Sequence, residues 1–150
     1  MLKEGDKAPD IRLANDAGEP FKLSDLKGKR VVLYFYPKAD TPGCTTQACE
    51  FRDDSEAFAQ KGAAVVGISP DKPAAQAKFK QKYELPFTLL ADEEKAAANA
   101  YGVWKEKNMY GKKVMGIERT TFVIGPDGKI EKIYNKVKAQ GHAAAVLAEL

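Results

Sequence analysis

The sequence predicts an α/β fold with a mixed central sheet, and three observations lead to it. Residues 31–36 and 63–69 are continuous apolar runs, typical of strands that are covered on both faces. A helical pattern between them indicates a strand–helix–strand crossover, and a second crossover follows. Near the carboxyl terminus, the turn at residues 125–128, Gly-Pro-Asp-Gly, joins two further strands in a hairpin.

The elements before and after the first central strand are read from turn residues and helix boundaries. Residues 11–23 predict an N-terminal hairpin around the turn at 15–18, and residues 24–28 predict a short helical turn closed by Gly28. One long helix is expected from about Thr41 to Lys61, ending at Gly62. Its apolar positions approximate one face: Cys44, Ala48, Phe51, Phe58 and Ala59.

The second half of the chain alternates shorter elements. The predicted elements are a helix over 73–83 that begins with proline, a strand over 87–90, an alanine-rich helix over 93–101, strands over 119–124 and 129–134, and a closing helix over 141–150. No repeat, low-complexity tract or linker interrupts this pattern. We therefore expect one domain spanning residues 1–150.

Composition is typical of a soluble globular protein, with 44% hydrophobic and 30% charged residues in a chain of 150. The net charge of +3 is spread along the chain. Its densest basic stretch contains Lys105, Lys107, Lys112 and Lys113, which we interpret as a solvated loop rather than a nucleic-acid patch. The first residues have no apolar core and no run reaches membrane-spanning length, so we expect a cytoplasmic protein without a signal peptide.

The block from Pro37 to Cys44 carries most of the functional information. It follows the apolar run 31–36, and Thr41 and Pro42 suit the N-cap and first position of a helix. Cys44 then lies three residues after the cap, where the Thr41 hydroxyl is expected to reach its N–H. Unpaired N–H groups and the positive end of the helix dipole both stabilise a thiolate, which is the nucleophilic form of cysteine.

The two cysteines, Cys44 and Cys49, are five residues apart on the predicted helix. Ideal helix geometry separates them by ~7.5 Å of rise and roughly 140° of rotation, so a disulfide requires the helix to unwind. A static cross-link closing so short a loop would stabilise little. The spacing is compatible with a chemical switch, and equally with Cys49 as a small core residue.

Other chemistries are less well matched by the sequence. Two cysteines and one distant histidine are too few ligands for a structural zinc site, and no Cys-x-x-Cys motif occurs. His142 is interpreted as a surface residue, and nothing requires it to lie beside Cys44 as a base. Arg119 starts a predicted strand, where α/β sites gather. It would stabilise a Cys44 thiolate if the two met, and otherwise is a solvated strand-end residue.

The pattern Pro37-x-x-x-Thr41-x-x-Cys44 resembles the active-site motif of the peroxiredoxins, and its surroundings resemble the bacterioferritin-comigratory protein, or peroxiredoxin Q, subfamily. The resemblance covers most of the chain. It extends over residues 5–10, 34–37, 40–45, 48–49, 51–53, 67–69, 89–92, 119–122 and 126–128. Gln47 stands where many members of the subfamily carry glutamate.

This resemblance implies a thioredoxin-like fold and thiol-dependent peroxidase activity without a metal or organic cofactor. Cys44 is then the peroxidatic cysteine and Cys49 the resolving cysteine of an intrachain disulfide. Thr41 and Arg119 orient the peroxide, and Pro37 shields the pocket. The implied partners are small peroxides and thioredoxin or a similar dithiol reductant, and we expect a monomer. Alternatives are a non-catalytic redox sensor and a thioredoxin-like binding domain with inert cysteines.

Overall fold

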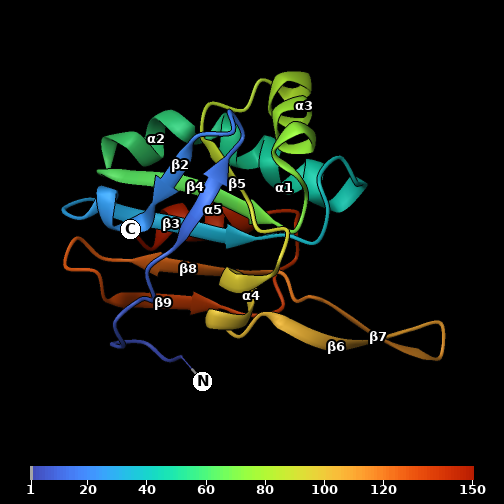
Figure 1. Ribbon diagram of the computed structural model, residues 1–150. Helices are drawn as coiled ribbons and strands as arrows, with labels where there is room; N and C mark the ends of the chain where they lie inside the picture. Colours follow the sequence, from blue (N-terminus) through green and yellow to red (C-terminus); the bar gives the residue numbers. More distant parts are fainter. Residues whose placement is uncertain (1) are drawn as a thin grey trace.

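The computed structural model describes residues 2–150 and has a seven-stranded mixed sheet at its centre (Figure 1). The strand order is β2-β1-β5-β4-β3-β8-β9. These strands are β1 (Arg12–Asn15), β2 (Pro20–Lys22), β3 (Arg30–Phe35), β4 (Ala63–Ser69), β5 (Thr88–Ala91), β8 (Thr120–Ile124) and β9 (Ile130–Tyr134). Strands β3, β4 and β5 are parallel, and the others pair antiparallel. The predicted mixed sheet with two crossovers is confirmed.

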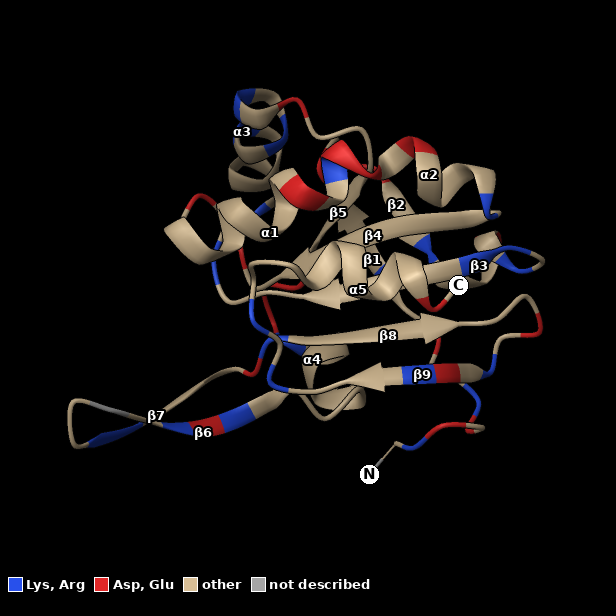
Figure 2. Cartoon of the chain, turned by 180° about the vertical axis from the view of Figure 1, so that it is seen from behind, with Lys and Arg blue, Asp and Glu red and all other residues tan. Residues whose placement is uncertain are grey.

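Helices cover both faces of the sheet. They are α1 (Pro42–Asp53), α2 (Ser55–Gln60), α3 (Pro73–Tyr83), α4 (Ala96–Ala100) and α5 (His142–Ala148), with the 3-10 turn η1 (Leu23–Leu26). One face carries α4 and η1, and α4 lies toward the viewer in Figure 1. The other face carries α1, α2, α3 and α5, and Figure 2 shows α1 and α5 in front of the sheet.

Strand β3 separates the two apolar clusters because its side chains alternate between the faces of the sheet. Leu33 and Phe35 lie in the cluster beneath α4, whereas Val32 and Tyr34 lie in the cluster beneath α1 and α5. All four are at most 1% exposed. The continuous apolar run in the sequence therefore reports burial on both faces, as predicted.

The single helix predicted from Thr41 to Lys61 is wrong, because the chain forms α1 and α2 with a break between them. Asp54 lies at the break with φ −96° and ψ 4°, outside the helical range. It belongs to the sequence Asp53-Asp54-Ser55, three residues whose short polar side chains compete with helical backbone bonds. Of the expected apolar face, Ala59 is exposed and the others are buried.

The basic stretch predicted as a loop is a two-stranded hairpin, formed by β6 (Trp104–Met109) and β7 (Lys112–Ile117). Its turn residues Tyr110 and Gly111 have φ of 53° and 77°, as a type I′ turn requires. Figures 1 and 2 show the hairpin projecting away from the body of the protein. The prediction failed because apolar alternation marks strands that are buried on one face, and this hairpin is mostly exposed.

The remaining predicted elements agree with the structure to within a few residues. The N-terminal hairpin is confirmed as β1 and β2, and β1 joins the main sheet beside β5. Helix α4 is shorter than the predicted 93–101 because Lys95 has φ 58° and begins the helix late. Arg119 lies just before β8 rather than inside it.

Candidate active site

The site lies where β3 leaves the centre of the sheet and α1 begins. Tyr36 is fully buried, and the chain then passes through Pro37, which is half-buried, to Thr41 at the N-cap of α1. Pro42 is at the first helical position, as predicted. The carboxyl ends of parallel strands are where open α/β sheets place their ligands, so the loop 37–41 opens at the expected edge.

The expected hydrogen bond of the Thr41 hydroxyl is not present in this conformation. Thr41 occupies the N-cap position with extended φ −98° and ψ 157°, but its side chain makes no capping bond. Its Oγ1 donates instead to the carbonyl oxygen of Lys38, at 2.8 Å. That bond closes the loop 38–41, so the Thr41 hydroxyl does not cap the first N–H groups of α1.

Cys44 and Arg119 meet, although they are 75 residues apart in the sequence. Arg119 Nη2 lies 3.3 Å from Cys44 Sγ, and the cysteine is only 2% exposed. Gly43 makes room for the guanidinium, since a Cβ there would lie 3.2 Å from Arg119 Nη2. The contact places a charged hydrogen-bond donor directly against the buried sulfur.

Gln47 is a site residue that the sequence analysis did not assign a role. Its Oε1 accepts a hydrogen bond from Arg119 Nη1 at 2.5 Å, and the residue is fully buried. Gln47 therefore fixes one edge of the guanidinium while the other edge faces Cys44. The signal was present, because a residue three positions after Cys44 lies on the same side of a helix. Within residues 2–150, Gln47 Nε2 is one of three buried side-chain atoms without a partner.

A buried chain of hydrogen bonds holds the loop before α1. The Tyr36 hydroxyl donates to Gln76 Oε1 at 2.6 Å, and Gln76 Nε2 donates to Ser69 Oγ at 2.8 Å. Ser69 Oγ donates to Asp71 Oδ2 at 2.7 Å, which also accepts from the backbone N–H of Ala39 at 2.7 Å. Burial raises the pKa of Tyr36 well above its usual value, so its hydroxyl stays a donor. The network ties the loop to β4 and α3.

Asp40 provides a second attachment for the same loop. It has φ 60°, a conformation that non-glycine residues seldom adopt, and its carboxylate binds α3. Asp40 Oδ1 accepts from the Tyr83 hydroxyl at 2.6 Å, and Oδ2 pairs with Lys82 Nζ at 2.9 Å. The bond from Tyr83, and then that from Lys82, lowers the pKa of Asp40. The loop is thereby fixed on two sides while α1 follows it.

Cys49 lies on α1 as predicted, partly exposed, and both cysteines are free thiols. Two residues further, Phe51 is fully buried and stacks on Tyr34 with ring centroids 4.7 Å apart. Tyr34 in turn lies against Gly67, where a Cβ would come within 2.9 Å of its ring. The last turn of α1 is thus anchored to the sheet at Phe51, and both cysteines precede that anchor.

His142 is buried, so its interpretation as a surface residue is wrong. It is 7% exposed, and its Nε2 lies 2.8 Å from the Thr121 hydroxyl oxygen on β8. The rings of Phe51 and Tyr134 pack edge-on against it. The buried imidazole is accommodated because it shares a hydrogen bond with the Thr121 hydroxyl. The two residues are distant in the sequence, so the local pattern does not reveal this pairing. Burial, and then the charge of Arg119, lowers the pKa of His142 to about 4.

The lowered pKa of His142 predicts a loss of stability in acid. The unfolded chain, with a histidine pKa of about 6.5, takes up a proton that the folded chain refuses between pH 6.5 and about 4. The free energy of unfolding should therefore fall by up to about 3 kcal/mol across that window. Urea unfolding of the wild type and His142→Gln at several pH values checks this. Equal pH dependence in the two proteins would contradict it.

Two global properties complete the description. Within residues 2–150, no three or more His, Cys, Asp and Glu side chains gather in a geometry that could hold a metal ion. None of the helices in the described part of the chain has the length and apolar character needed to cross a bilayer.

The fold and the site together define a thiol-based oxidoreductase on a thioredoxin-like scaffold: a cysteine at a helix start, held by an arginine, at the carboxyl edge of the sheet. The AhpC/TSA family profile matches residues 4–133. The chain is 53% identical to peroxiredoxin Bcp of Bacillus subtilis over 149 residues, covering 99% of this chain and 95% of that protein. It is 47% identical to peroxiredoxin Bcp of Escherichia coli K12 over 146 residues, covering 97% and 94%.

Solved structures agree with this assignment. A PrxQ variant of Xylella fastidiosa superposes with a TM-score of 0.94 at 37% identity, covering 99% of this chain and 95% of that one. The bacterioferritin comigratory protein of Xanthomonas campestris, described for alkyl peroxide reduction, gives 0.88 at 41%, covering 93% and 88%. The chain therefore belongs to the AhpC/TSA family and, within it, to the Bcp or PrxQ peroxiredoxins, which are peroxidases that use a peroxide substrate and a reductant.

Proposed function

We propose that the protein reduces hydrogen peroxide and organic hydroperoxides through Cys44, with Cys49 as the resolving cysteine. The observation that carries the proposal is the contact between a 2%-exposed Cys44 Sγ and Arg119 Nη2 at 3.3 Å, at the first turn of α1. The Arg119 guanidinium stabilises the Cys44 thiolate and directs a hydrogen-bond donor toward the peroxide oxygen that comes to lie beside the sulfur. Attack on a peroxide needs both a nucleophilic sulfur and a donor to the leaving oxygen.

In the first step, the Cys44 thiolate attacks one oxygen of ROOH in line with the O–O bond. The S–O bond forms as the O–O bond breaks, the sulfur is oxidised to sulfenic acid, and the other oxygen leaves with the electron pair and takes up a proton as ROH. Arg119 and the backbone N–H of Cys44 stabilise the charge on the leaving oxygen. Thr41 joins them once its hydroxyl leaves the Lys38 carbonyl, and Pro37 shields the sulfur from water.

In the second step, the Cys49 thiol attacks the sulfenic sulfur of Cys44, a disulfide forms and water leaves. Both cysteines belong to α1, and five residues of intact helix hold them ~7.5 Å apart along its axis. The first turns of α1 must therefore unwind before the two sulfurs meet. A dithiol protein, thioredoxin in our proposal, then returns two electrons by thiol–disulfide exchange. The chain works as one domain, as a monomer, in the cytoplasm.

The mass of the protein after one equivalent of hydrogen peroxide tests this function. The wild type should lose the mass of two hydrogen atoms, whereas Cys49→Ser should gain one oxygen and Cys44→Ser should stay unchanged. With excess thioredoxin, thioredoxin reductase and NADPH, the wild type should consume peroxide continuously. Consumption that stops after one equivalent would indicate a redox sensor, and resistance of both thiols to alkylation would indicate an inert binding domain.

A further inference from the structure

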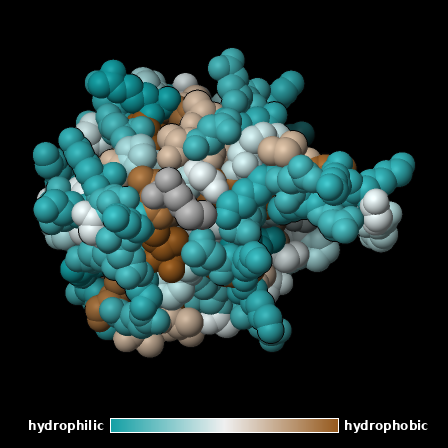
Figure 3. All heavy atoms as spheres, turned by 90° about the horizontal axis from the view of Figure 1, so that it is seen from below, coloured by the Kyte–Doolittle hydropathy of each residue, from teal (hydrophilic) through white to brown (hydrophobic). Residues whose placement is uncertain are grey.

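The projecting β6–β7 hairpin holds a charge equal to the net charge of the whole protein. Residues 104–117 contain four lysines and one glutamate, a formal net charge of +3, which equals that of the entire chain. The two strands pair only with each other. Figure 2 shows lysine segments along β6 and β7, and Figure 3 shows mainly hydrophilic atoms on the projection at the right. The rest of the chain is formally neutral in sum, so the expectation that the net charge is spread along the chain is wrong.

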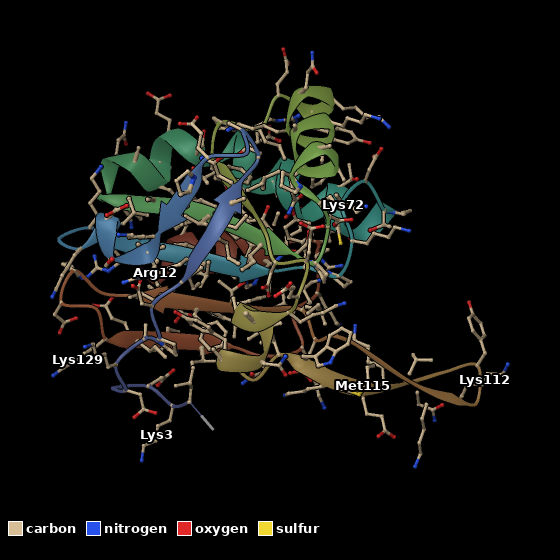
Figure 4. All side chains as sticks on the ribbon, in the orientation of Figure 1. Lys3, Arg12, Lys72, Lys112, Met115 and Lys129 are labelled. Atoms are coloured by element: carbon tan, nitrogen blue, oxygen red, sulfur yellow. The ribbon has the colours of Figure 1, made fainter. Side chains whose placement is uncertain are left out.

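The same hairpin also exposes apolar side chains. In the part of the chain that the structure describes, three large hydrophobic residues are exposed, and all belong to the hairpin: Tyr110 at 100%, Met115 at 51% and Val114 at 40%. Figure 4 shows Met115 and Lys112 along its length. Tyrosine and methionine are enriched at protein interfaces, so their exposure makes the hairpin a candidate contact surface.

The strand register divides the hairpin into two faces. Residues paired directly across an antiparallel ladder share a face. Lys105 is opposite Gly116, and Lys107 is opposite Val114. With Lys112 two residues from Val114, this defines a lysine face made of Lys105, Lys107, Lys112 and Val114. The opposite face contains Glu106, Lys113 and Met115.

The base of the lysine face adjoins the active site, whereas Lys112 lies next to the turn at the tip of the hairpin. Lys107 packs along Gly116, with Cδ 3.3 Å from where a Cβ would lie, and it is partly buried. Burial, and then the positive charge of Arg119, lowers the pKa of Lys107. Lys105 Nζ pairs at 2.8 Å with Glu118, the neighbour of Arg119.

Two lysines of this face have no internal carboxylate. Among residues 2–150, Lys107 and Lys112 have no carboxylate within 4.0 Å, in contrast to Lys105 with Glu118 and Lys113 with Glu106. Their charges are therefore available to a partner that approaches the site. Two copies of this face would repel each other, so self-association through it is disfavoured.

We propose that the lysine face, with Tyr110 at its tip, docks an acidic surface of the dithiol protein that reduces the oxidised enzyme. The proposal rests on the function above, in which each cycle ends with a Cys44–Cys49 disulfide. The partner's thiolate must attack one of those sulfurs, forming a mixed disulfide, and its second thiol then releases the reduced enzyme. A projecting cationic face whose base adjoins the active site would steer an acidic partner toward that disulfide and raise its association rate.

Lys112 and Lys113 give a matched pair for the test, because they are adjacent in sequence and lie on opposite faces. Steady-state turnover is measured with varied thioredoxin, and each protein is normalised to its own turnover with dithiothreitol, which is small and uncharged. We expect Lys112→Glu to lower kcat/KM for thioredoxin by about tenfold, with Lys113→Glu near the wild type. Added salt should lower the wild-type value and leave the dithiothreitol rate unaffected.

The outcomes are distinct. Equal losses in Lys112→Glu and Lys113→Glu, or no loss in either, would overturn the docking face. Normal thioredoxin kinetics in Lys112→Glu together with lost binding to phosphatidylglycerol vesicles would also overturn it, and would assign the hairpin to a lipid surface. A wild type that turns over with neither reductant would refute the peroxidase function itself, and the docking proposal with it. Wild-type turnover with dithiothreitol preserves the peroxidase function whatever the hairpin variants show.

Discussion

Replacing Arg119 by alanine should slow the oxidation of Cys44 by hydrogen peroxide on the order of 10² to 10³-fold, as removal of one donor from a leaving-oxygen site typically does. Arg119 is the residue whose side chain contacts Cys44 Sγ at 3.3 Å, and Gln47 holds its other edge at 2.5 Å. Arg119→Lys keeps the charge but loses the planar pair of donors, so its rate should lie between the two. Stopped-flow oxidation at fixed pH gives all three rates.

The matched control for this prediction is Arg12→Ala. Arg12 is an arginine on β1 whose side chain is 74% exposed, with one distant partner, Asp10 at 3.7 Å. Its replacement should leave both the rate and the melting temperature near the wild-type values. An unchanged oxidation rate in Arg119→Ala would show that the arginine merely packs beside the sulfur.

Oxidation to the disulfide should unwind the first part of α1 and leave the sheet intact. In the reduced protein, amides of residues 45–50 should be protected from hydrogen exchange, because Thr45 is the first residue of α1 whose N–H reaches an acceptor in the helix, the carbonyl of Thr41. In the disulfide form they should exchange at least about 10²-fold faster, because intact helix keeps the sulfurs of Cys44 and Cys49 apart. Strand β3 and helix α3 should change little, because the Tyr36–Gln76 hydrogen bond holds them independently of α1.

Cys49→Ser separates unwinding from oxidation itself. Its Cys44 should reach sulfenic acid with the helix still protected, and should then pass more readily to sulfinic acid, since no second thiol intercepts it. Exchange measured by mass spectrometry on both proteins distinguishes the states. Full protection of residues 45–50 in the oxidised wild type, or a disulfide that links two chains, would falsify unwinding within one chain.

The sequence predicted the sheet well because burial leaves a strong trace in it. Strands β3 and β4 are apolar at nearly every position, and α3 begins at Pro73 as expected. The hairpin was missed for the converse reason: with both faces largely open, residues 104–117 show no apolar alternation. His142 was misplaced because a buried polar residue depends on a distant partner, Thr121, that local pattern does not name.

The site was predictable in its local part and not in its assembled part. The placement of Thr41, Pro42 and Cys44 at a helix start follows from capping preferences alone. The contact of Cys44 with Arg119 joins segments 75 residues apart, and only the resemblance to a known family connected them before the structure did. The Thr41 hydroxyl was expected to accept from the Cys44 N–H, but it donates to the Lys38 carbonyl instead. The two bonds differ only in the rotation of one side chain, and the sequence does not determine which of them forms.

The break at Asp54 limits how many helical residues must unwind in each catalytic cycle. Helix α1 has 12 residues and α2 has six, and each packs against the body by its own buried aromatic, Phe51 and Phe58. Because helix cooperativity depends on a continuous series of backbone hydrogen bonds, two helices separated by a break can unwind independently. Opening the stretch that bears the cysteines therefore spares α2. Cys49 competes with a second peroxide molecule for the Cys44 sulfenic acid. Because only the first helix has to unwind for Cys49 to reach it, the conformational change that this reaction requires is small and local.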